Sequence, residues 1–122
     1  MIGYVTLGTK DLKRAAAFYD ALFGELGAKR VMDYERFILW GNSPTAPLLG
    51  VILPHDGKPA CVGNGVMVAL AAKSKEQVDQ LYQKAIELGA TDEGPAGPRG
   101  QGFYAGYFRD PDGNKLNFYF MG

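Results

Sequence analysis

Histidine and cysteine, two side chains often used as bases, nucleophiles and metal ligands, each occur once in this chain of 122 residues. His55 is the only histidine, and it stands in the turn-forming run Pro54-His55-Asp56-Gly57. One histidine cannot build a two-histidine metal site, and its neighbours favour a solvated loop position over a catalytic one. Cys61 is the only cysteine. A nucleophilic thiol requires a neighbouring base, and the residues around Cys61 give no sign of one.

The overall composition excludes several classes of function. Lys plus Arg and Asp plus Glu both number 13, so the chain has no net charge and no electrostatic footprint for nucleic acid or an anionic membrane. Apolar residues make up 47%, enough for one domain core. The pattern of apolar residues leads us to expect no signal peptide and no membrane span, and the lone cysteine fits a reducing compartment. We therefore expect one cytoplasmic domain over residues 1–122, with no nucleic-acid or membrane partner.

The chain contains two similar halves. Alternating residues predict a strand at 2–9, and the apolar spacing after Asp11 predicts an amphipathic helix. The second half repeats this plan with a strand at 66–72 and a helix that begins after Ser74, which forms a capping box with Gln77. A shift of 63 residues places Leu7 on Leu70, Lys10 on Lys73 and Tyr19 on Tyr82. These matches indicate an internal duplication.

Three short β-like runs follow each predicted helix, so each half is expected to be a βαβββ module. The runs are 28–34, 36–42 and 48–54 in the first half, and 91–94, 103–109 and 115–121 in the second. Module one is predicted over about 1–57, a polar connector over about 55–65 and module two over about 63–122. The Gly- and Pro-rich stretch 94–102 is predicted to be a loop. Neither half could bury its sheet face alone, so the halves are modules of one domain.

Paired modules of this kind resemble the vicinal oxygen chelate superfamily, which comprises glyoxalases, bleomycin-resistance proteins and dioxygenases. The resemblance spans essentially the whole chain and implies an α+β fold. In that fold the two modules form a curved, open eight-stranded mixed sheet with the helices outside. Function does not follow from it, because members include isomerases, dioxygenases, epimerases, thiol transferases and drug-binding proteins. The matching residues are Val5-Thr6-Leu7-Gly8, Asp11-Leu12, Phe18-Tyr19, the run from Gly63 to Ala69, and the run from Gly102 to Leu116 with Arg109-Asp110-Pro111-Asp112-Gly113-Asn114-Lys115.

The resemblance also implies where a metal would bind. Metal-using members take ligands from the inner face of the first and last strand of each half, where His or a carboxylate stands. The equivalent positions here are Tyr4, Met67, Asn117 and, within about a residue, Val51. Valine has no donor atom, a thioether is a soft ligand, an amide is a weak one and a phenol must first lose its proton. We therefore expect no family-type metal site and no cofactor.

The same resemblance predicts a pocket for a small molecule. Strand alternation would turn Tyr4, Met67, Asn117 and Tyr119 into the cupped sheet, an amphipathic set suited to an organic ligand. A methionine at the position of Met67 fills an irregular gap in the core even more readily than it lines a pocket. Arg99 is the only charge in 94–102, a loop that lies at the pocket mouth in relatives. At the pocket mouth, Arg99 would bind a carboxylate or phosphate of the ligand. The alternative is that Arg99 faces solvent on a surface loop.

Three functions fit these features. The first is metal-independent binding of a small aromatic or acidic molecule. The alternative is a glyoxalase-like lyase or isomerase that acts on a small oxygenated substrate, against which stands the lack of an acid–base pair. The third is a role in assembly with a closed pocket. Relatives often form homodimers, so a homodimer is expected. Trp40 is open to assignment as pocket wall, core or interface.

Overall fold

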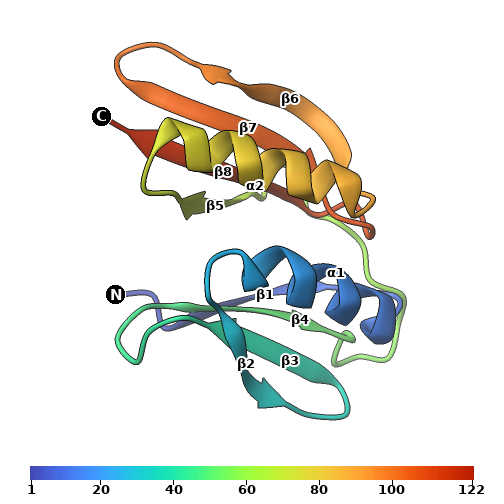
Figure 1. Ribbon diagram of the computed structural model, residues 1–122. Helices are drawn as coiled ribbons and strands as arrows, with labels where there is room; N and C mark the ends of the chain where they lie inside the picture. The colour runs from blue at the N-terminus through green and yellow to red at the C-terminus, as the bar shows by residue number, and fades with distance from the viewer. The chain divides into compact units, whose positions relative to one another are not determined.

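The computed structural model describes all 122 residues, which form two compact units, Met1–Val62 and Gly63–Gly122. Each unit is one βαβββ module (Figure 1), as the sequence predicts. The eight strands are hydrogen-bonded as two four-stranded mixed sheets. The predicted α+β fold of repeated modules is therefore confirmed, with four strands in each sheet.

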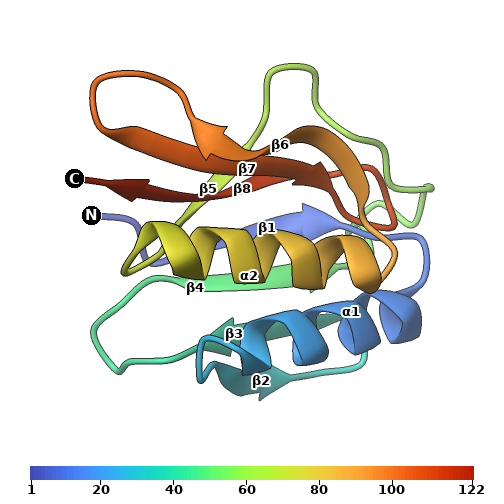
Figure 2. The same cartoon turned by 45° about the horizontal axis from the view of Figure 1, so that its top comes forward.

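The first module orders its strands β1-β4-β3-β2, with β1 parallel to β4 and the other neighbours antiparallel. The carboxylate of Asp11 caps the helix by accepting the backbone N–H of Arg14 at 3.0 Å. The helix lies along one face of its own sheet (Figures 1 and 2). The elements are β1 (Tyr4–Gly8), α1 (Leu12–Gly24), β2 (Lys29–Asp33), β3 (Phe37–Gly41) and β4 (Leu48–Ile52).

Trp40 belongs to the core of the first module. Its ring centroid lies 5.6 Å from that of Tyr19 and 6.1 Å from that of Phe23, both on α1. The indole N–H donates to the carboxylate of Asp20 at 2.9 Å, so this buried donor has a partner. These contacts assign Trp40 to the core and exclude a role in a pocket wall.

Asp20 is the centre of a charged network that joins α1 to β2 and β3. Arg30 donates to both oxygens of Asp20, at 3.0 and 2.6 Å, and to Asp33 at 2.8 Å. The hydrogen bonds from Arg30 hold the pKa of Asp20 below its ordinary value, and the two carboxylates raise the pKa of Arg30. The network thus fixes the edge strand β2 to the helix.

The second module repeats this topology in the order β5-β8-β7-β6. The predicted capping box is present, because the hydroxyl of Ser74 accepts the N–H of Gln77 at 3.1 Å, and the Gln77 side chain accepts the N–H of Lys73 at 2.7 Å. The elements are β5 (Val68–Ala71), α2 (Lys75–Glu87), β6 (Thr91–Pro98), β7 (Phe103–Arg109) and β8 (Lys115–Met121).

The predicted boundary of β6 is wrong. A strand was expected over 91–94 with a loop after it, whereas β6 continues to Pro98. Two register shifts on either side of Gly94, which has a φ of 152°, interrupt its pairing with β7. An edge strand with bulges tolerates Gly and Pro, so a composition typical of loops here forms a strand.

The Asp-Pro-Asp-Gly segment is a turn that joins β7 to β8. The buried carboxylate of Asp110 accepts the backbone N–H groups of Asp112 and Asn114 at 3.0 and 2.9 Å. Gly113, at a φ of 91°, donates its N–H to the carbonyl of Asp110 at 2.9 Å. The Asp-Pro-Asp-Gly motif thus has a structural role, because this turn sets the register of the β7–β8 hairpin.

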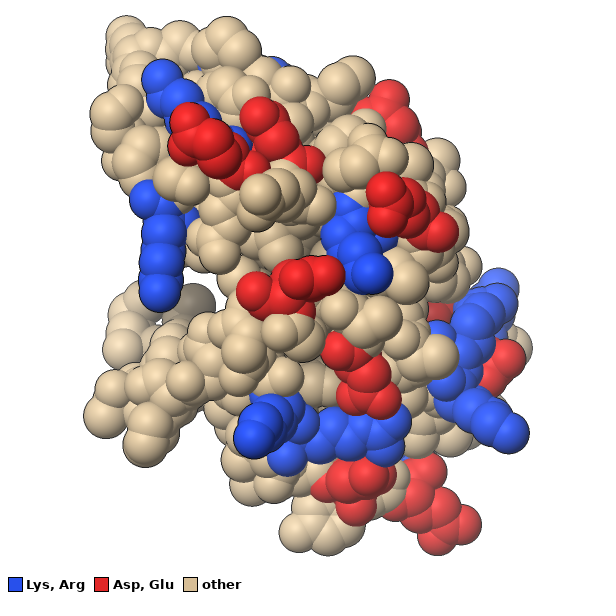
Figure 3. Space-filling model, viewed as in Figure 1, with Lys and Arg blue, Asp and Glu red and all other residues tan.

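Basic and acidic side chains are interspersed on the face shown in Figure 3, consistent with the balanced composition. Neither α1 nor α2 has the length and apolar character needed to cross a membrane.

Candidate functional site

The sheet of the second module has two chemically different faces. Phe108, Leu116 and Phe118 are fully buried on the face that α2 covers. Successive residues of a strand point to opposite sides of a sheet. Asn117 and Tyr119 of β8 therefore lie on the face away from the helix.

Asn117 is the most unusual polar residue of that face. It pairs with Ala69 of β5 and with Tyr107 of β7, and it is only 1% exposed. Its side-chain oxygen Oδ1 is buried and has no hydrogen-bond partner. A buried acceptor without a donor costs free energy, so each such group requires an explanation.

Aromatic rings lie on both sides of Asn117. Tyr119 stacks on Phe103 with ring centroids 5.5 Å apart. On the other side, Arg99 and Lys115 lie over the ring of Tyr107, at 5.4 and 5.5 Å from its centroid. The face therefore combines a buried amide acceptor with half-buried aromatic surface and two cations.

Arg99 directly follows β6 and folds back over that strand. Its guanidinium donates to the carbonyls of Pro95, Gly97 and Pro98 at 2.6, 3.0 and 3.3 Å. A Cβ at Gly94 or Gly97 would lie 3.3 or 3.4 Å from the guanidinium nitrogens. The small residues of this stretch thus make room for Arg99, whose head group is held at Tyr107.

The structure brings three of the five predicted ligand-binding residues together: Arg99, Asn117 and Tyr119. Met67 immediately precedes β5, two residues before the Ala69 that pairs with Asn117, and is 40% exposed. Tyr4 belongs to the first module, where it is 63% exposed on the sheet face away from α1.

Tyr107 and Lys115 were missed in the sequence. The sequence nevertheless allows their positions to be deduced, because the turn at Asp110–Gly113 makes Arg109 and Lys115 cross-strand partners. Two residues farther from the turn on each strand of this hairpin, Tyr107 lies opposite Asn117.

The fourth metal position, expected within about a residue of Val51, falls at Gly50. Val51 pairs with Leu7 and is buried on the side of α1. Gly50 is the equivalent of Asn117, because it pairs with Thr6, the repeat mate of Ala69. A Cβ at Gly50 would overlap the side chain of Leu39 and lie 2.5 Å from the carbonyl of Ile38.

These donors do not fit the metal site of metal-using relatives. The first module has glycine at one of the four positions, and the other three offer a phenol, a thioether and a neutral amide. No three His, Cys, Asp or Glu side chains form a group that could hold a metal ion. His55 accepts a hydrogen bond from Arg36 at 3.1 Å, and Cys61 is exposed and free.

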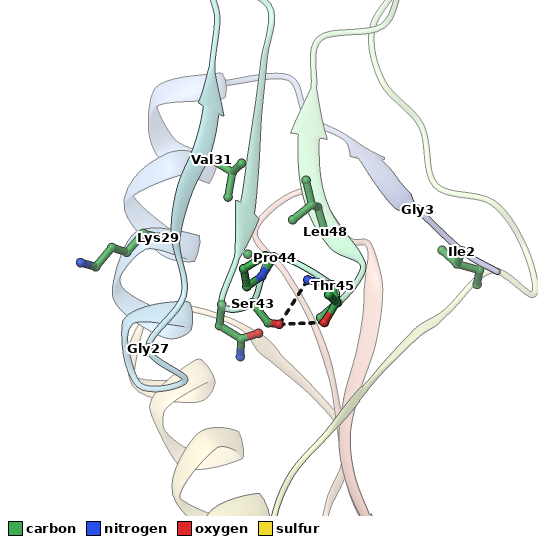
Figure 4. Close-up of a pocket in the computed structure, with 12 residues that line it drawn as sticks. Ile2, Gly3, Gly27, Lys29, Val31, Ser43, Pro44, Thr45 and Leu48 are labelled. Carbon is green, nitrogen blue, oxygen red and sulfur yellow. Dashed lines mark hydrogen bonds between the residues drawn. The ribbon is translucent and has the colours of Figure 1, made fainter.

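A hollow of about 680 Å³ in the first module offers less chemistry (Figure 4). Val31 and Leu48 contribute apolar surface, and Lys29 extends away from the other labelled side chains. The hydroxyls of Ser43 and Thr45 lie 3.3 Å apart and bond each other within the turn. None of the predicted site residues lines this hollow.

Comparisons with known proteins agree with the fold. The family model described as "Glyoxalase/Bleomycin resistance protein/Dioxygenase superfamily" matches residues 1–118. A glyoxalase/bleomycin resistance protein from Albidiferax ferrireducens is 37% identical, with a TM-score of 0.91 over 100% of this chain and 99% of the other. No curated protein matches the chain.

Two more distant structures share the fold. A glyoxalase-related enzyme from Fulvimarina pelagi is 24% identical, with a TM-score of 0.78 over 98% of this chain and 87% of the other. A lactoylglutathione lyase from Agrobacterium tumefaciens is 23% identical, with a TM-score of 0.72 over 98% and 92%. At these identities the likeness concerns the fold alone.

Proposed function

Because the chain belongs to the glyoxalase/bleomycin resistance protein/dioxygenase superfamily, we propose that it binds a small organic molecule without a metal, on the sheet face that carries Asn117. The buried, unpartnered oxygen of Asn117 carries this proposal. A ligand N–H or O–H group would supply the missing hydrogen bond and remove its desolvation cost.

The surroundings of Asn117 indicate the chemistry of the ligand. The rings of Tyr107 and Tyr119 lie on the same face and would bury a planar or aromatic body. Arg99 and Lys115 lie at Tyr107, where they would attract an acidic substituent. We therefore expect an aromatic molecule that carries a hydrogen-bond donor and an acidic group. Met67, which immediately precedes β5 in the same module, is proposed to complete the pocket.

The alternative function, a glyoxalase-like lyase or isomerase, has less support. Such a reaction needs a general base within reach of the bound substrate. The carboxylate on this side of β6, Glu93, is held by Arg109 at 2.7 Å. No free acid–base pair therefore accompanies Asn117, and ligand binding alone is the better proposal.

A thermal-shift screen of small aromatic acids tests the proposal. The wild type is compared with Asn117→Leu, Met67→Trp and Arg99→Ala. Ligands should raise the Tm of the wild type and have little effect on Asn117→Leu and Met67→Trp. Arg99→Ala should weaken acidic ligands and leave neutral ones nearly unchanged, because only the acidic group meets the guanidinium.

The decisive comparison is between the variants. Ligands that stabilise Asn117→Leu or Met67→Trp as well as the wild type bind elsewhere, and this would contradict the site. Turnover of a hit compound, followed by mass spectrometry, would favour the lyase or isomerase instead.

We also propose that the protein is a cytoplasmic homodimer. Support comes from the edge strand β2, on which Val31 and Met32 are exposed. Sedimentation equilibrium would check the association, and a monomer at micromolar concentration would contradict it.

A further inference from the structure

A second hollow, of about 520 Å³, lies in the first module where β1 and β4 end. Its charged side chains are Lys10, Arg36 and Lys58, and no Asp or Glu lines it. We call this hollow the basic pocket. It consists wholly of residues of the first module and is distinct from the face that carries Asn117.

The walls of the basic pocket are held by backbone hydrogen bonds. Thr9 donates to the carbonyl of Ile52 at 3.0 Å, and Leu53 donates to that of Arg36 at 2.9 Å. Gly57, at a φ of 75°, closes a turn by donating to Pro54 at 3.1 Å. A ligand would therefore find walls that are already ordered, which lowers the entropic cost of binding.

The connector is packed tightly against the end of β1. A Cβ at Gly8 would lie 3.0 Å from the Cβ of Ala60. Pro59 and Ala60 of this segment line the pocket together with Leu53 and Pro54. One part of the pocket is therefore apolar, and another carries the three cations.

The contacts that Arg36 and Lys58 make leave the charges of these two side chains without a counter-ion. Arg36 donates to Nδ1 of His55 at 3.1 Å, and a guanidinium has no acceptor atom, so the imidazole nitrogen accepts. The accepting nitrogen brings no negative charge, so this contact does not offset the charge of Arg36. Lys58 donates its backbone N–H to the carboxylate of Asp56 at 2.9 Å, and its side chain forms no ion pair. The like charges of Arg36 and Lys58 repel each other in this hollow until an anion binds between them.

We propose that the basic pocket binds a small organic dianion, of the kind formed by a phosphate monoester. The anionic head would meet Arg36, Lys58 and Lys10, and a guanidinium is well suited to two oxygens of such a group. The organic body would lie against Leu53, Pro54 and Pro59. Anion binding here does not depend on the function proposed for Asn117.

Calorimetric titration with phenyl phosphate at low ionic strength tests this proposal. Phenyl phosphate should bind more tightly than inorganic phosphate, because only it has an apolar body, and neutral phenol should not bind. Arg36→Gln and Lys58→Gln should each weaken binding by roughly 10- to 100-fold, the usual effect of losing one charge-assisted hydrogen bond. Amide shifts in NMR spectra should cluster at Thr9, Arg36 and Lys58.

Lys73 provides a matched control. It is the repeat mate of Lys10 and precedes α2 as Lys10 precedes α1, so Lys73→Gln removes the same charge at the equivalent place of the other module. Lys10→Gln should weaken binding, and Lys73→Gln should not. Equal weakening by both variants would mean attraction by net charge alone and would overturn the proposal. So would the absence of saturable binding, or shifts confined to the second module.

Discussion

Asn117 faces Tyr107 across the β7–β8 ladder, with its side-chain oxygen buried and without a donor. If this oxygen serves a ligand, it lowers the stability of the free protein. We predict that Asn117→Leu raises the free energy of unfolding of the ligand-free protein by about 1 kcal/mol, because the desolvation cost of the amide disappears. Urea unfolding measures this change. A loss of stability comparable to that of a core truncation would show that the amide has a structural role.

Asp20 is predicted to stabilise the first module through Trp40. Asp20→Ala leaves the buried indole N–H without its acceptor, at a cost of about 1–3 kcal/mol. Asp20→Asn keeps an acceptor oxygen and should cost less. Both variants are compared by urea unfolding. Equal losses in the two variants would indicate that the charge, and not the hydrogen bond to Trp40, is what matters.

The same carboxylate predicts a dependence of stability on pH. Its pKa is lowered in the folded protein, mainly by the hydrogen bonds from Arg30. A lowered folded pKa stabilises the fold above the unfolded value of about 3.9 and loses this contribution as the pH falls through the folded pKa. The free energy of unfolding should therefore decrease below about pH 4. Asp20→Asn should reduce this slope, and an unchanged slope would contradict the assignment.

Gly106 and Gly24 should respond in opposite directions to alanine. A Cβ at Gly106 would lie 2.9–3.0 Å from the side chain of Tyr82, whose hydroxyl is held by Asp92 at 2.6 Å, so Gly106→Ala should cost about 1–3 kcal/mol. Nothing lies within 4 Å of a Cβ at Gly24, at the end of α1, so Gly24→Ala should stabilise by about 0.5–1 kcal/mol. Thermal unfolding of both variants checks the pair.

The Tyr82–Asp92 hydrogen bond provides a second measurement of the effect of Gly106→Ala. Burial, followed by the hydrogen bond to Asp92, raises the pKa of Tyr82 to about 12. If Gly106→Ala displaces Tyr82 from Asp92, the pKa of Tyr82 should fall. Ultraviolet titration of the phenol measures this change. A large loss of stability with no change in the titration would place the strain elsewhere.

The purified protein should carry no stoichiometric divalent metal. The candidate donors are Tyr4, Met67 and Asn117, and Gly50 leaves the fourth position without a side chain. Such a set lacks the three strong ligands that a stable site needs. Elemental analysis after purification without chelators provides the measurement. About one zinc, nickel, manganese or iron ion per chain would contradict it.

The sequence by itself determined the local elements and their repetition. Asp11 and Ser74 mark the helix starts because a side-chain acceptor next to free backbone N–H groups acts over a few residues. The face on which Tyr4 and Asn117 lie follows from strand alternation, which is also local. The family resemblance rested on the same short-range features.

Only the tertiary structure decided the features that depend on pairing between distant residues. The continuation of β6 to Pro98 depends on bulged pairing with β7, and composition alone favoured a loop. The choice between Gly50 and Val51 depends on the parallel register of β1 and β4, which no turn connects. Arg99 donates to the carbonyls of Pro95, Gly97 and Pro98 because the fold places them within reach of its guanidinium. The oxygen of Asn117 lacks a partner because none of the groups packed around it donates to it. Such contacts are made across space, so the order of residues along the chain does not specify them.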